Sequence, residues 1–441
     1  MYKTLGFKWL LERFCPESAF VSADSDEARN PQRFIHVTVV RHAGQHHIQV
    51  STVDKKITYM DSDLFTFPIG YHSFHKKQLY NFQLNRWHSL GYLSYDDLKT
   101  AGEKIRKFDD WKPVLLEQAD NKLDTGKYIE AAFFYRAAEF YTLYGQEDKE
   151  LLYDKFIDLF YSNVPLEGVH VEKVPYKESF LHVLKMPNKT EIKKGTVLIH
   201  IGFDSFIEEF YSIAWYFTTQ GYDVIAFDGP GQGKSVKKFN VQFDFEWEKP
   251  VKTILDYYKI SEAALLGISL GGWLCLRAAA FEPRIKWVIS SGGAYDYYKI
   301  PPAIARWMMD FFKKYMREGS NKIALKGIEK GGMEAWRNSN IMYITKIDIP
   351  MDAFEYAWQM NSKNLHADKI TQDVMVITGK DDHFIPFKLH APLIKSLINA
   401  KSVTDIVFTK TDHASNHCSI GNIKLSLDRM INWLDKKIEE K

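Results

Sequence analysis

The sequence predicts an α/β protein whose core is a mainly parallel, doubly wound sheet. From residue 168 onward, short β-branched runs alternate with helical or loop stretches, a pattern typical of parallel strands joined by helices on both faces of a sheet. The turn Gly267–Gly271 stands between one buried run and a strong helix former. The length of 441 residues is enough for two or three structural units around a large core.

The composition excludes several classes of partner. Lys and Arg total 58 against 56 for Asp and Glu, and a net charge of +2 provides no field for nucleic acid. No apolar run reaches the roughly 18 residues of a membrane span. The cysteines Cys15, Cys275 and Cys418 are few and far apart, which disfavours disulfides and zinc sites. We therefore expect a cytoplasmic protein with no nucleic-acid or membrane partner.

Residues 1–74 are predicted to form an N-terminal extension that is partly β. The β-branched runs 33–40 and 46–53 flank a short turn that holds Gly44, which predicts a hairpin. Histidines are frequent here, but their spacing matches no metal-ligand pattern, so no metal site is expected. The sequence leaves the purpose of residues 1–70 open.

Residues 75–162 are predicted to form a small, all-helical cap domain. Asp109 and Asp110 open one helical segment, and residues 128–143 carry Ala, Phe, Tyr and Glu at the three-to-four spacing of a helix.

Residues 163–441 are predicted to form the α/β domain, in which each strand is followed by a helical or loop stretch. Between about 294 and 370 the alternation stops, and an aromatic- and Met-rich stretch predicts a helical insertion over one end of the sheet. The expected strands are residues 169–174, 180–184, 195–201, 222–227, 263–266, 287–290, 374–378 and 404–408.

The turn Gly267-Ile268-Ser269-Leu270-Gly271 has the pattern of a nucleophile elbow. The strand before it and the helix after it provide the context that a strained, exposed serine needs, and the glycines allow close backbone approach. A serine hydroxyl attacks a carbonyl only when a neighbouring base takes its proton. Ser269 is therefore the candidate nucleophile.

The acid and the base of a triad should follow later strands, in the chain order Ser, Asp, His. The loop after residues 374–378 holds Asp381 and Asp382, and a carboxylate there could orient an imidazole. We choose Asp382, although Asp381 is adjacent. After the last strand, His413 and His417 compete for the role of base, and spacing leaves both open.

Two further features concern anions. An oxyanion hole is expected from the N–H of Leu270 and an N–H of the loop after an early strand, where Phe203 is the candidate donor.

The stretch 228–235 looks like a phosphate loop, but Asp228 stands where the motif needs glycine and Pro230 removes a backbone donor. Neither ATP nor GTP, nor any other cofactor, is expected.

Taken together, these blocks resemble the α/β-hydrolase superfamily, and within it the 2,6-dihydroxypseudooxynicotine hydrolase-like and FrsA-like branch with its fungal polyketide-pathway members. The resemblance spans roughly residues 75–437. The blocks that carry it are Gly202-Phe203-Asp204-Ser205, Phe227–Gly233, Gly267–Gly272 and His417–Asn422.

The resemblance implies three points about the site. The final histidine of this branch lies in a His-Cys block, which favours His417 over His413. Members place an acidic residue after the oxyanion glycine, in some cases assisting catalysis, and Asp204 stands at that position; a helix-capping carboxylate is the alternative. Residues 1–70 have no counterpart in the branch.

We expect a hydrolase that acts on a small-molecule ester, or on an amide or carbon–carbon bond, through Ser269, His417 and Asp382 and an acyl-enzyme. A homodimer is compatible with the sequence. An acylaminoacyl- or dipeptidyl-type peptidase is the alternative activity, but the propeller repeats of the prolyl-oligopeptidase kind are absent. A non-catalytic binding or regulatory protein on a hydrolase scaffold is the alternative of another class.

Overall fold

The computed structural model describes residues 34–42, 45–53 and 65–440. The chain divides into two compact units, Met1–Leu64 and Phe65–Lys441. In the first unit, β1 (Phe34–His42) pairs with antiparallel β2 (Gln45–Val53), so that Phe34 lies opposite Val53. The predicted hairpin is thus present, while Gly44 of its turn and Cys15 lie outside the described residues.

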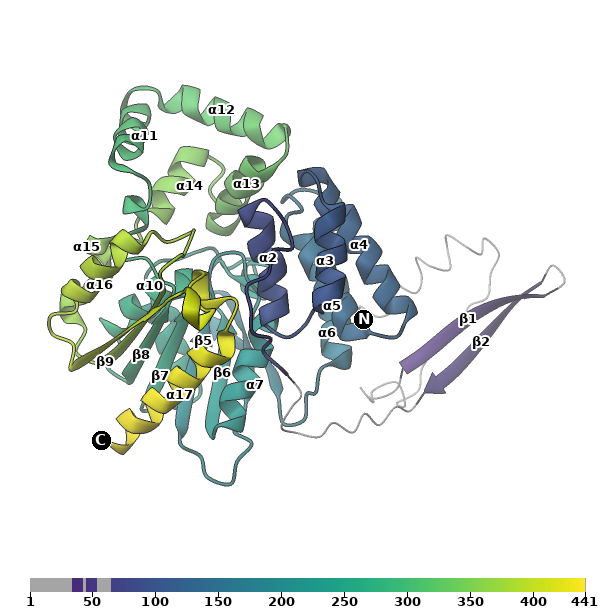
Figure 1. Cartoon of the computed structure of the whole chain (residues 1–441), viewed down its shortest axis with the longest axis horizontal. Helices are drawn as coiled ribbons and strands as arrows, with labels where there is room; N and C mark the ends of the chain where they lie inside the picture. Colours follow the sequence, from purple (N-terminus) through teal and green to yellow (C-terminus); the bar gives the residue numbers. More distant parts are fainter. Residues whose placement is uncertain (1–33, 43–44, 54–64, 441) are drawn as a thin grey trace. The chain divides into compact units, whose positions relative to one another are not determined.

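An eight-stranded sheet forms the centre of the second unit (Figure 1). Its strand order is β10-β9-β8-β7-β5-β6-β4-β3, in which β4 runs antiparallel to both of its neighbours, β3 and β6, and all other neighbouring pairs are parallel. This arrangement confirms the predicted α/β fold class. The strands are β3 (His170–Tyr176), β4 (Ser179–Met186), β5 (Gly195–His200), β6 (Tyr222–Asp228), β7 (Ala263–Ile268), β8 (Ile285–Ser291), β9 (Asp373–Gly379) and β10 (Ser402–Phe408).

Helices cover both faces of this sheet. As a result, every residue of the strands β7 and β9 is buried. On one face, alternate strand residues such as Leu265 and Val288 share a core with α9 (Glu248–Tyr257) and α10 (Leu270–Ala279). On the other face lie α7 (Tyr211–Thr219) against β6 and α17 (Ile423–Glu439) against β8 and β9 (Figure 1). Two short helices, α8 (Gly233–Lys237) and α16 (His390–Ser396), complete the layers.

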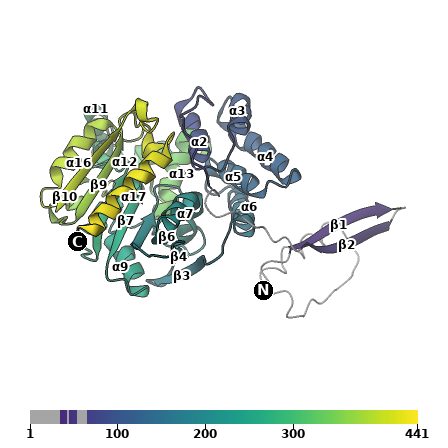
Figure 2. The same ribbon diagram turned by 60° about the horizontal axis from the view of Figure 1, so that its bottom comes forward.

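Among the described residues, five helices precede the sheet and form a separate group beside it, drawn in blue in Figure 2. Consecutive members pack against each other, most extensively α4 with α5 and α5 with α6. They are α2 (Gln78–Ser89), α3 (Tyr95–Lys104), α4 (Phe108–Asp124), α5 (Tyr128–Phe140) and α6 (Glu147–Asn163).

A second helical group lies between β8 and β9 in the sequence, and all of its helices except the last are at the top of Figure 1. It consists of α11 (Ala303–Tyr315), α12 (Arg317–Glu329), α13 (Met333–Thr345), α14 (Pro350–Ala357) and α15 (Ser362–Leu365). The short 3-10 turns are η2 (Ile207–Phe210), η3 (Tyr297–Lys299), η4 (Ala367–Lys369), η5 (Phe387–Leu389), η6 (Lys410–Asp412) and η7 (His417–Ser419). Within the described part of the chain, no helix is both long and apolar enough to cross a membrane.

Candidate active site

Ser269 occupies a sharp turn between β7 and α10. Its backbone has φ 61° and ψ −120°, a strained conformation for a residue with a side chain. Two hydrogen bonds hold the turn: the N–H of Ser269 donates to the carbonyl of Ser291 at 2.8 Å, and the N–H of Gly272 donates to the carbonyl of Ser269 at 2.8 Å. Such a turn presents the hydroxyl at the carboxyl end of the strand, as a nucleophile elbow requires.

The glycines around Ser269 are needed for close packing. A Cβ added to Gly267 would lie 2.0 Å from the carbonyl oxygen of Gly271 and 2.9 Å from the Cβ of Cys275. Any larger residue at position 267 would therefore push α10 away from β7. This contact gives the physical reason for the glycine two residues before the serine.

His417 hydrogen-bonds to Ser269 on one side and to Asp382 on the other. Its Nε2 lies 2.8 Å from the Oγ of Ser269, and its Nδ1 lies 2.6 Å from the Oδ2 of Asp382. The imidazole is buried, at the start of η7 after the last strand. His413 is exposed, on the turn that follows η6. The structure therefore brings His417, and not His413, to the serine.

The carboxylate of Asp382 is held in one orientation by its own loop. Its Oδ1 accepts hydrogen bonds from the N–H groups of Phe384 at 2.8 Å and Ile385 at 2.9 Å, which leaves Oδ2 for His417. The neighbouring Asp381 is exposed. Since the loop donates to one oxygen and the imidazole faces the other, Asp382 can fix the tautomer of His417.

The same contact determines the charge of the imidazole. Burial acts to lower the pKa of His417, but the negative charge of Asp382 and the hydrogen bond to it outweigh this, so that the pKa lies well above the ordinary value of 6.5. The site therefore stabilises an imidazolium, the form that His417 takes when it accepts a proton.

The loop after β5 lies directly over Ser269. A Cβ added to Gly202 would lie 2.7 Å from the Cβ and 3.0 Å from the Oγ of Ser269. Gln232 holds this loop, donating from Nε2 to the carbonyls of Ile201 at 2.5 Å and Gly202 at 3.3 Å. Phe203 follows Gly202, and Leu270 is the first residue of α10, where helical N–H groups lack intrahelical partners.

Asp204 does not cap a helix. The next helical turn, η2, begins at Ile207, and the carboxylate that caps it belongs to Glu209, which accepts from the N–H of Phe206 at 2.9 Å. The side chain of Asp204 is buried and accepts a hydrogen bond from the hydroxyl of Tyr144 at 3.3 Å. Burial raises the pKa of this carboxyl. Asp204 is not among the residues that line the cavity beside Ser269.

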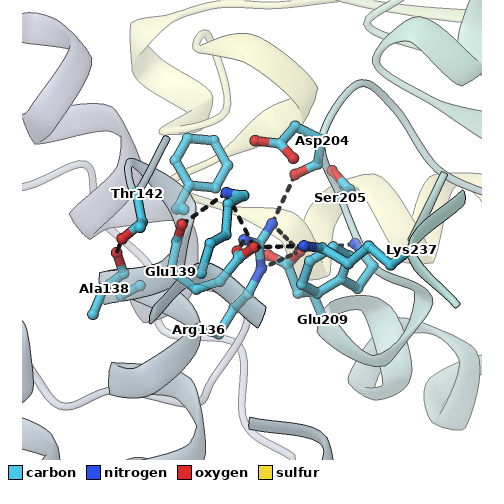
Figure 3. A network of polar contacts seen from close by, with 12 residues as sticks. Arg136, Ala138, Glu139, Thr142, Asp204, Ser205, Glu209 and Lys237 are labelled. Carbon is cyan, nitrogen blue, oxygen red and sulfur yellow. Dashed lines mark hydrogen bonds and ion pairs between the residues drawn. The ribbon is translucent and has the colours of Figure 1, made fainter. Parts of the chain in front are cut away.

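A buried network of charged side chains ties the N-terminal helices to this loop (Figure 3). Arg136 of α5 donates to Glu209 Oε1 at 3.0 Å and to the carbonyl of Asp204 at 2.7 Å. Arg86 of α2 donates to Glu209 Oε2 at 2.7 Å and to the hydroxyl of Ser205 at 3.0 Å. The two guanidinium groups thus hold the loop after β5 at Asp204 and Ser205.

Glu139 forms ion pairs with further buried cations of this network (Figure 3). It pairs with Arg136, and its Oε1 lies 3.1 Å from both Lys149 and Lys237. Burial acts to raise the pKa of Glu139, but the three cations outweigh it and lower the pKa to about 2. The loop is therefore fixed by ion pairs that solvent does not screen.

An apolar cavity of about 370 Å³ opens beside Ser269 and His417. Its walls come from both helical groups and from the sheet, and its size is in the range of small-molecule sites. The N-terminal helices contribute Phe82, Gln83, Arg86 and Leu90 from α2 and Phe140 from α5. The insertion and α17 contribute Trp336, Arg337, Ile341, Phe354, Trp358, Ile423, Leu427 and Met430.

These cavity residues of α2 were not predicted as site residues. Almost every residue of α2 is buried, including the polar side chains of Gln83 and Arg86. A helix that is buried on all sides has no polar stripe that would mark its orientation in the sequence. Gln232 was likewise not predicted as a site residue, because nothing in its local sequence shows that its side chain donates to the carbonyls of Ile201 and Gly202.

The stretch 228–235 is structural. Asp228 accepts hydrogen bonds from the N–H groups of Ile207 at 3.0 Å and Lys234 at 2.8 Å. A protein carboxylate thus occupies the start of α8, where a phosphate would have to bind.

The donor atoms of His182, Glu208 and Asp228 lie within 4.8 Å of one another, a grouping that could hold a metal ion. They are engaged with each other and with the backbone, however, since His182 Nε2 lies 3.0 Å from Glu208 Oε1. Burial and the charge of Glu208 raise the pKa of Asp228 to about 7. The contacts describe a hydrogen-bonded core cluster.

Comparison with known proteins identifies the class. Residues 195–364 match the family described as "alpha/beta hydrolase fold". The crystal structure of 2,6-dihydroxy-pseudo-oxynicotine hydrolase superimposes with a TM-score of 0.57 at 19% identity, covering 81% of this chain and 95% of that one. The chain has the α/β-hydrolase fold.

Curated relatives narrow the class further. The chain is 27% identical over 342 residues to Hydrolase LUC6 of Fusarium sp, covering 70% of this chain and 80% of that protein. It is 25% identical over 339 residues to 20-hydroxy-prefusarin hydrolase FUS2 of Gibberella moniliformis, with the same coverage. It is also 27% identical to 2,6-dihydropseudooxynicotine hydrolase of Paenarthrobacter nicotinovorans, over 46% of this chain and 60% of that protein. The chain is a hydrolytic enzyme, and its sequence is similar to these hydrolases.

Proposed function

We propose that the protein is a serine hydrolase that cleaves an ester, or a related carbonyl compound, of a small apolar molecule. The observation that carries the proposal is the hydrogen-bonded chain from Ser269 Oγ through His417, at 2.8 Å, to Asp382, at 2.6 Å. Three side chains in this order match the geometry of a Ser-His-Asp triad.

In the proposed reaction, Ser269 Oγ attacks the carbonyl carbon while its proton passes to Nε2 of His417. Asp382 stabilises the resulting imidazolium. The N–H groups of Phe203 and Leu270 receive the oxyanion. His417 then gives the proton to the leaving group, and the carbon–oxygen bond of the substrate breaks to leave an acyl-enzyme. A water molecule, deprotonated by His417, hydrolyses the ester on Ser269 and returns the site to its starting state.

The substrate class is inferred from the cavity. Its walls are mainly aromatic and aliphatic, which favours an apolar compound over a peptide or a charged metabolite. One relative carries a name that specifies 20-hydroxy-prefusarin as its substrate, and this supports a small organic molecule here. We assign Asp204 a positioning role, through Tyr144, because its carboxylate does not line the cavity.

The test is labelling with a fluorophosphonate probe together with turnover of p-nitrophenyl acetate. Wild-type protein should be labelled and Ser269→Ala should not. His417→Ala should lose turnover by on the order of 10⁴-fold, whereas the matched variant His413→Ala should keep it. Equal labelling of wild type and Ser269→Ala, or an active His417→Ala beside an inactive His413→Ala, would contradict the assignment.

A further inference from the structure

Helix α11 carries a continuous apolar stripe that nothing in the described chain covers. No residue of α11 is buried, although half of its side chains are large and apolar. The stripe follows helical spacing, i, i+3, i+4, i+7, i+8 and i+11, which places its members on one face. Its residues and exposed fractions are Ile304 66%, Trp307 63%, Met308 46%, Phe311 41%, Phe312 37% and Tyr315 64%.

Charged contacts hold α11 and α12 in place while the stripe stays exposed. Arg317, at the start of α12, pairs with Asp352 and Glu355 of α14, and Lys313 of α11 lies 2.9 Å from Glu355. Figure 1 shows the two helices at the outer edge of the insertion, with α13 and α14 between them and the sheet. Packing on the rest of the insertion therefore does not explain the apolar residues of the stripe.

The same segment is strongly basic. Residues 303–330 contain seven Lys and Arg against three Asp and Glu, a net charge of +4, whereas the whole chain carries only +2. The rest of the chain is therefore slightly acidic, and the positive charge is concentrated beside the exposed apolar stripe. A partner for this face should combine negative charge with an apolar interior.

We propose that α11 docks in the interface of an anionic lipid surface. Its apolar stripe would enter the boundary between headgroups and acyl chains, and neighbouring Lys and Arg would contact lipid phosphates. Its 13 residues extend over roughly 20 Å, short of the roughly 30 Å of a bilayer core, so the helix lies on the membrane and does not span it. The absence of an apolar run of roughly 18 residues excludes a spanning helix but not a helix that lies in the interface.

Charge disfavours a second copy of this chain as the occupant. In a symmetric pair the same face would meet itself, and two positively charged segments would be opposed, each with a surplus of two cations after Asp352 and Glu355 are counted. An anionic lipid surface has the opposite sign and is apolar beneath its headgroups.

Docking would also bring the cavity close to lipid. Ile300, which lines the cavity, lies three positions before the first residue of α11, and α13 and α14 contribute further lining residues. An apolar compound dissolved in the bilayer would then be close to the cavity. This step depends on the proposed function, but lipid docking itself does not.

The experiment is flotation of the full chain with vesicles of phosphatidylcholine, alone or mixed with phosphatidylglycerol. Wild-type protein should float with the mixed vesicles, and Ser269→Ala should float equally, which separates docking from catalysis. Trp307→Glu with Phe311→Glu should lower the partition coefficient at least about tenfold. Lys314→Glu with Lys322→Glu should also lower it, since each basic residue contributes about fivefold near an anionic surface.

The matched control replaces exposed apolar residues elsewhere. Leu151→Glu with Ile192→Glu changes side chains that are 58% and 76% exposed, outside the insertion, and should leave flotation unchanged. Thermal unfolding of each variant establishes that it is folded. The proposal is overturned by failure of wild type to float with the mixed vesicles, or by equal losses in the control. A wild-type dimer that Trp307→Glu with Phe311→Glu converts to a monomer would also overturn it, because the face would then be a self-interface.

Discussion

The candidate chemistry depends on a few atoms whose positions the backbone around them determines. Ser269 is held in a strained conformation by hydrogen bonds on both sides, and Asp382 has one oxygen fixed by two N–H groups. Gly202 is as important as the side chains, because only the absence of a Cβ lets the loop after β5, residues 201–205, reach the serine; we call it the oxyanion loop after its proposed role.

We therefore expect Gly202→Ala to impair catalysis far more than folding. The added Cβ would lie 2.7 Å from the Cβ of Ser269, so the loop and its N–H groups must shift, at a cost of about 10²-fold in kcat/KM. The matched variant Gly319→Ala adds a Cβ that meets no atom within 4 Å and should leave kcat/KM unchanged. Turnover of p-nitrophenyl acetate measures both, and equal effects in the two variants would contradict this account.

The pH profile should report the charge of His417. The base must be neutral to accept the serine proton, and its pKa is raised well above 6.5 by Asp382; hence kcat/KM should fall as pH drops through that raised pKa. Asp382→Asn removes the negative charge, lowers the pKa, and should shift the acidic limb to lower pH, together with a loss of about 10⁴-fold in rate. An acidic limb that stays at the same pH in Asp382→Asn would show that another group controls it.

At the scale of elements, α2 and α5 act on the site through the oxyanion loop. Arg86 and Arg136 both bind Glu209, and Arg136 also binds the loop carbonyl of Asp204. These contacts are buried, so removing one partner leaves the remaining charges with less compensation and no solvent to replace it. The helical group before the sheet is thus part of the site's framework, in addition to supplying cavity walls.

Arg136→Met should accordingly destabilise the second unit by roughly 3–5 kcal/mol, because Glu139 and Glu209 lose a buried partner. Lys104→Met is the matched control: its pair with Glu117 is 2.6 Å long but about half exposed, at 43% and 50%. We expect that variant to lose less than about 1 kcal/mol. Urea unfolding followed by circular dichroism distinguishes the two, and similar midpoints would argue against a structural role for the network.

At the scale of the whole molecule, the cavity exists only where three parts of the chain meet. Phe82 comes from the N-terminal helices, Ile341 from the insertion and Leu427 from the last helix. No part alone encloses the space beside Ser269. Specificity for the acyl or leaving group should therefore depend on all three parts.

The mainly apolar walls predict a preference for longer acyl chains. From p-nitrophenyl acetate to hexanoate, kcat/KM should rise by up to about fourfold per methylene, the value of one buried CH₂ group. Ile341→Trp narrows the cavity and should reduce this gain, with little effect on the acetate ester. Ile323→Trp, at a side chain 73% exposed and outside the cavity, is the control. A flat chain-length profile in wild type would contradict the assigned substrate class.

Local patterns in the sequence predicted most of the fold. Each predicted strand of the α/β domain is present. Buried β-branched runs and the glycines of a tight turn are patterns among residues close together in the sequence, so they can be recognised without the fold. The same holds for Ser269, whose strand, turn and helix are contiguous. The cavity role of Gln83 and Arg86 was not predictable in this way, since α2 is buried on all sides.

The sequence by itself thus determined the parallel sheet, the elbow at Ser269 and the short set of acids and bases that could serve it. Only the tertiary structure decided between His413 and His417, which are four residues apart. The side chain of His413 is exposed, whereas the imidazole of His417 lies 2.8 Å from the hydroxyl of Ser269, a residue 148 positions earlier in the chain. Only the tertiary structure showed that Asp204 faces Tyr144 and that two arginines hold the oxyanion loop. The physical reason is that turns and strands follow from short-range sterics and periodicity, whereas contacts across the molecule depend on how the whole core packs.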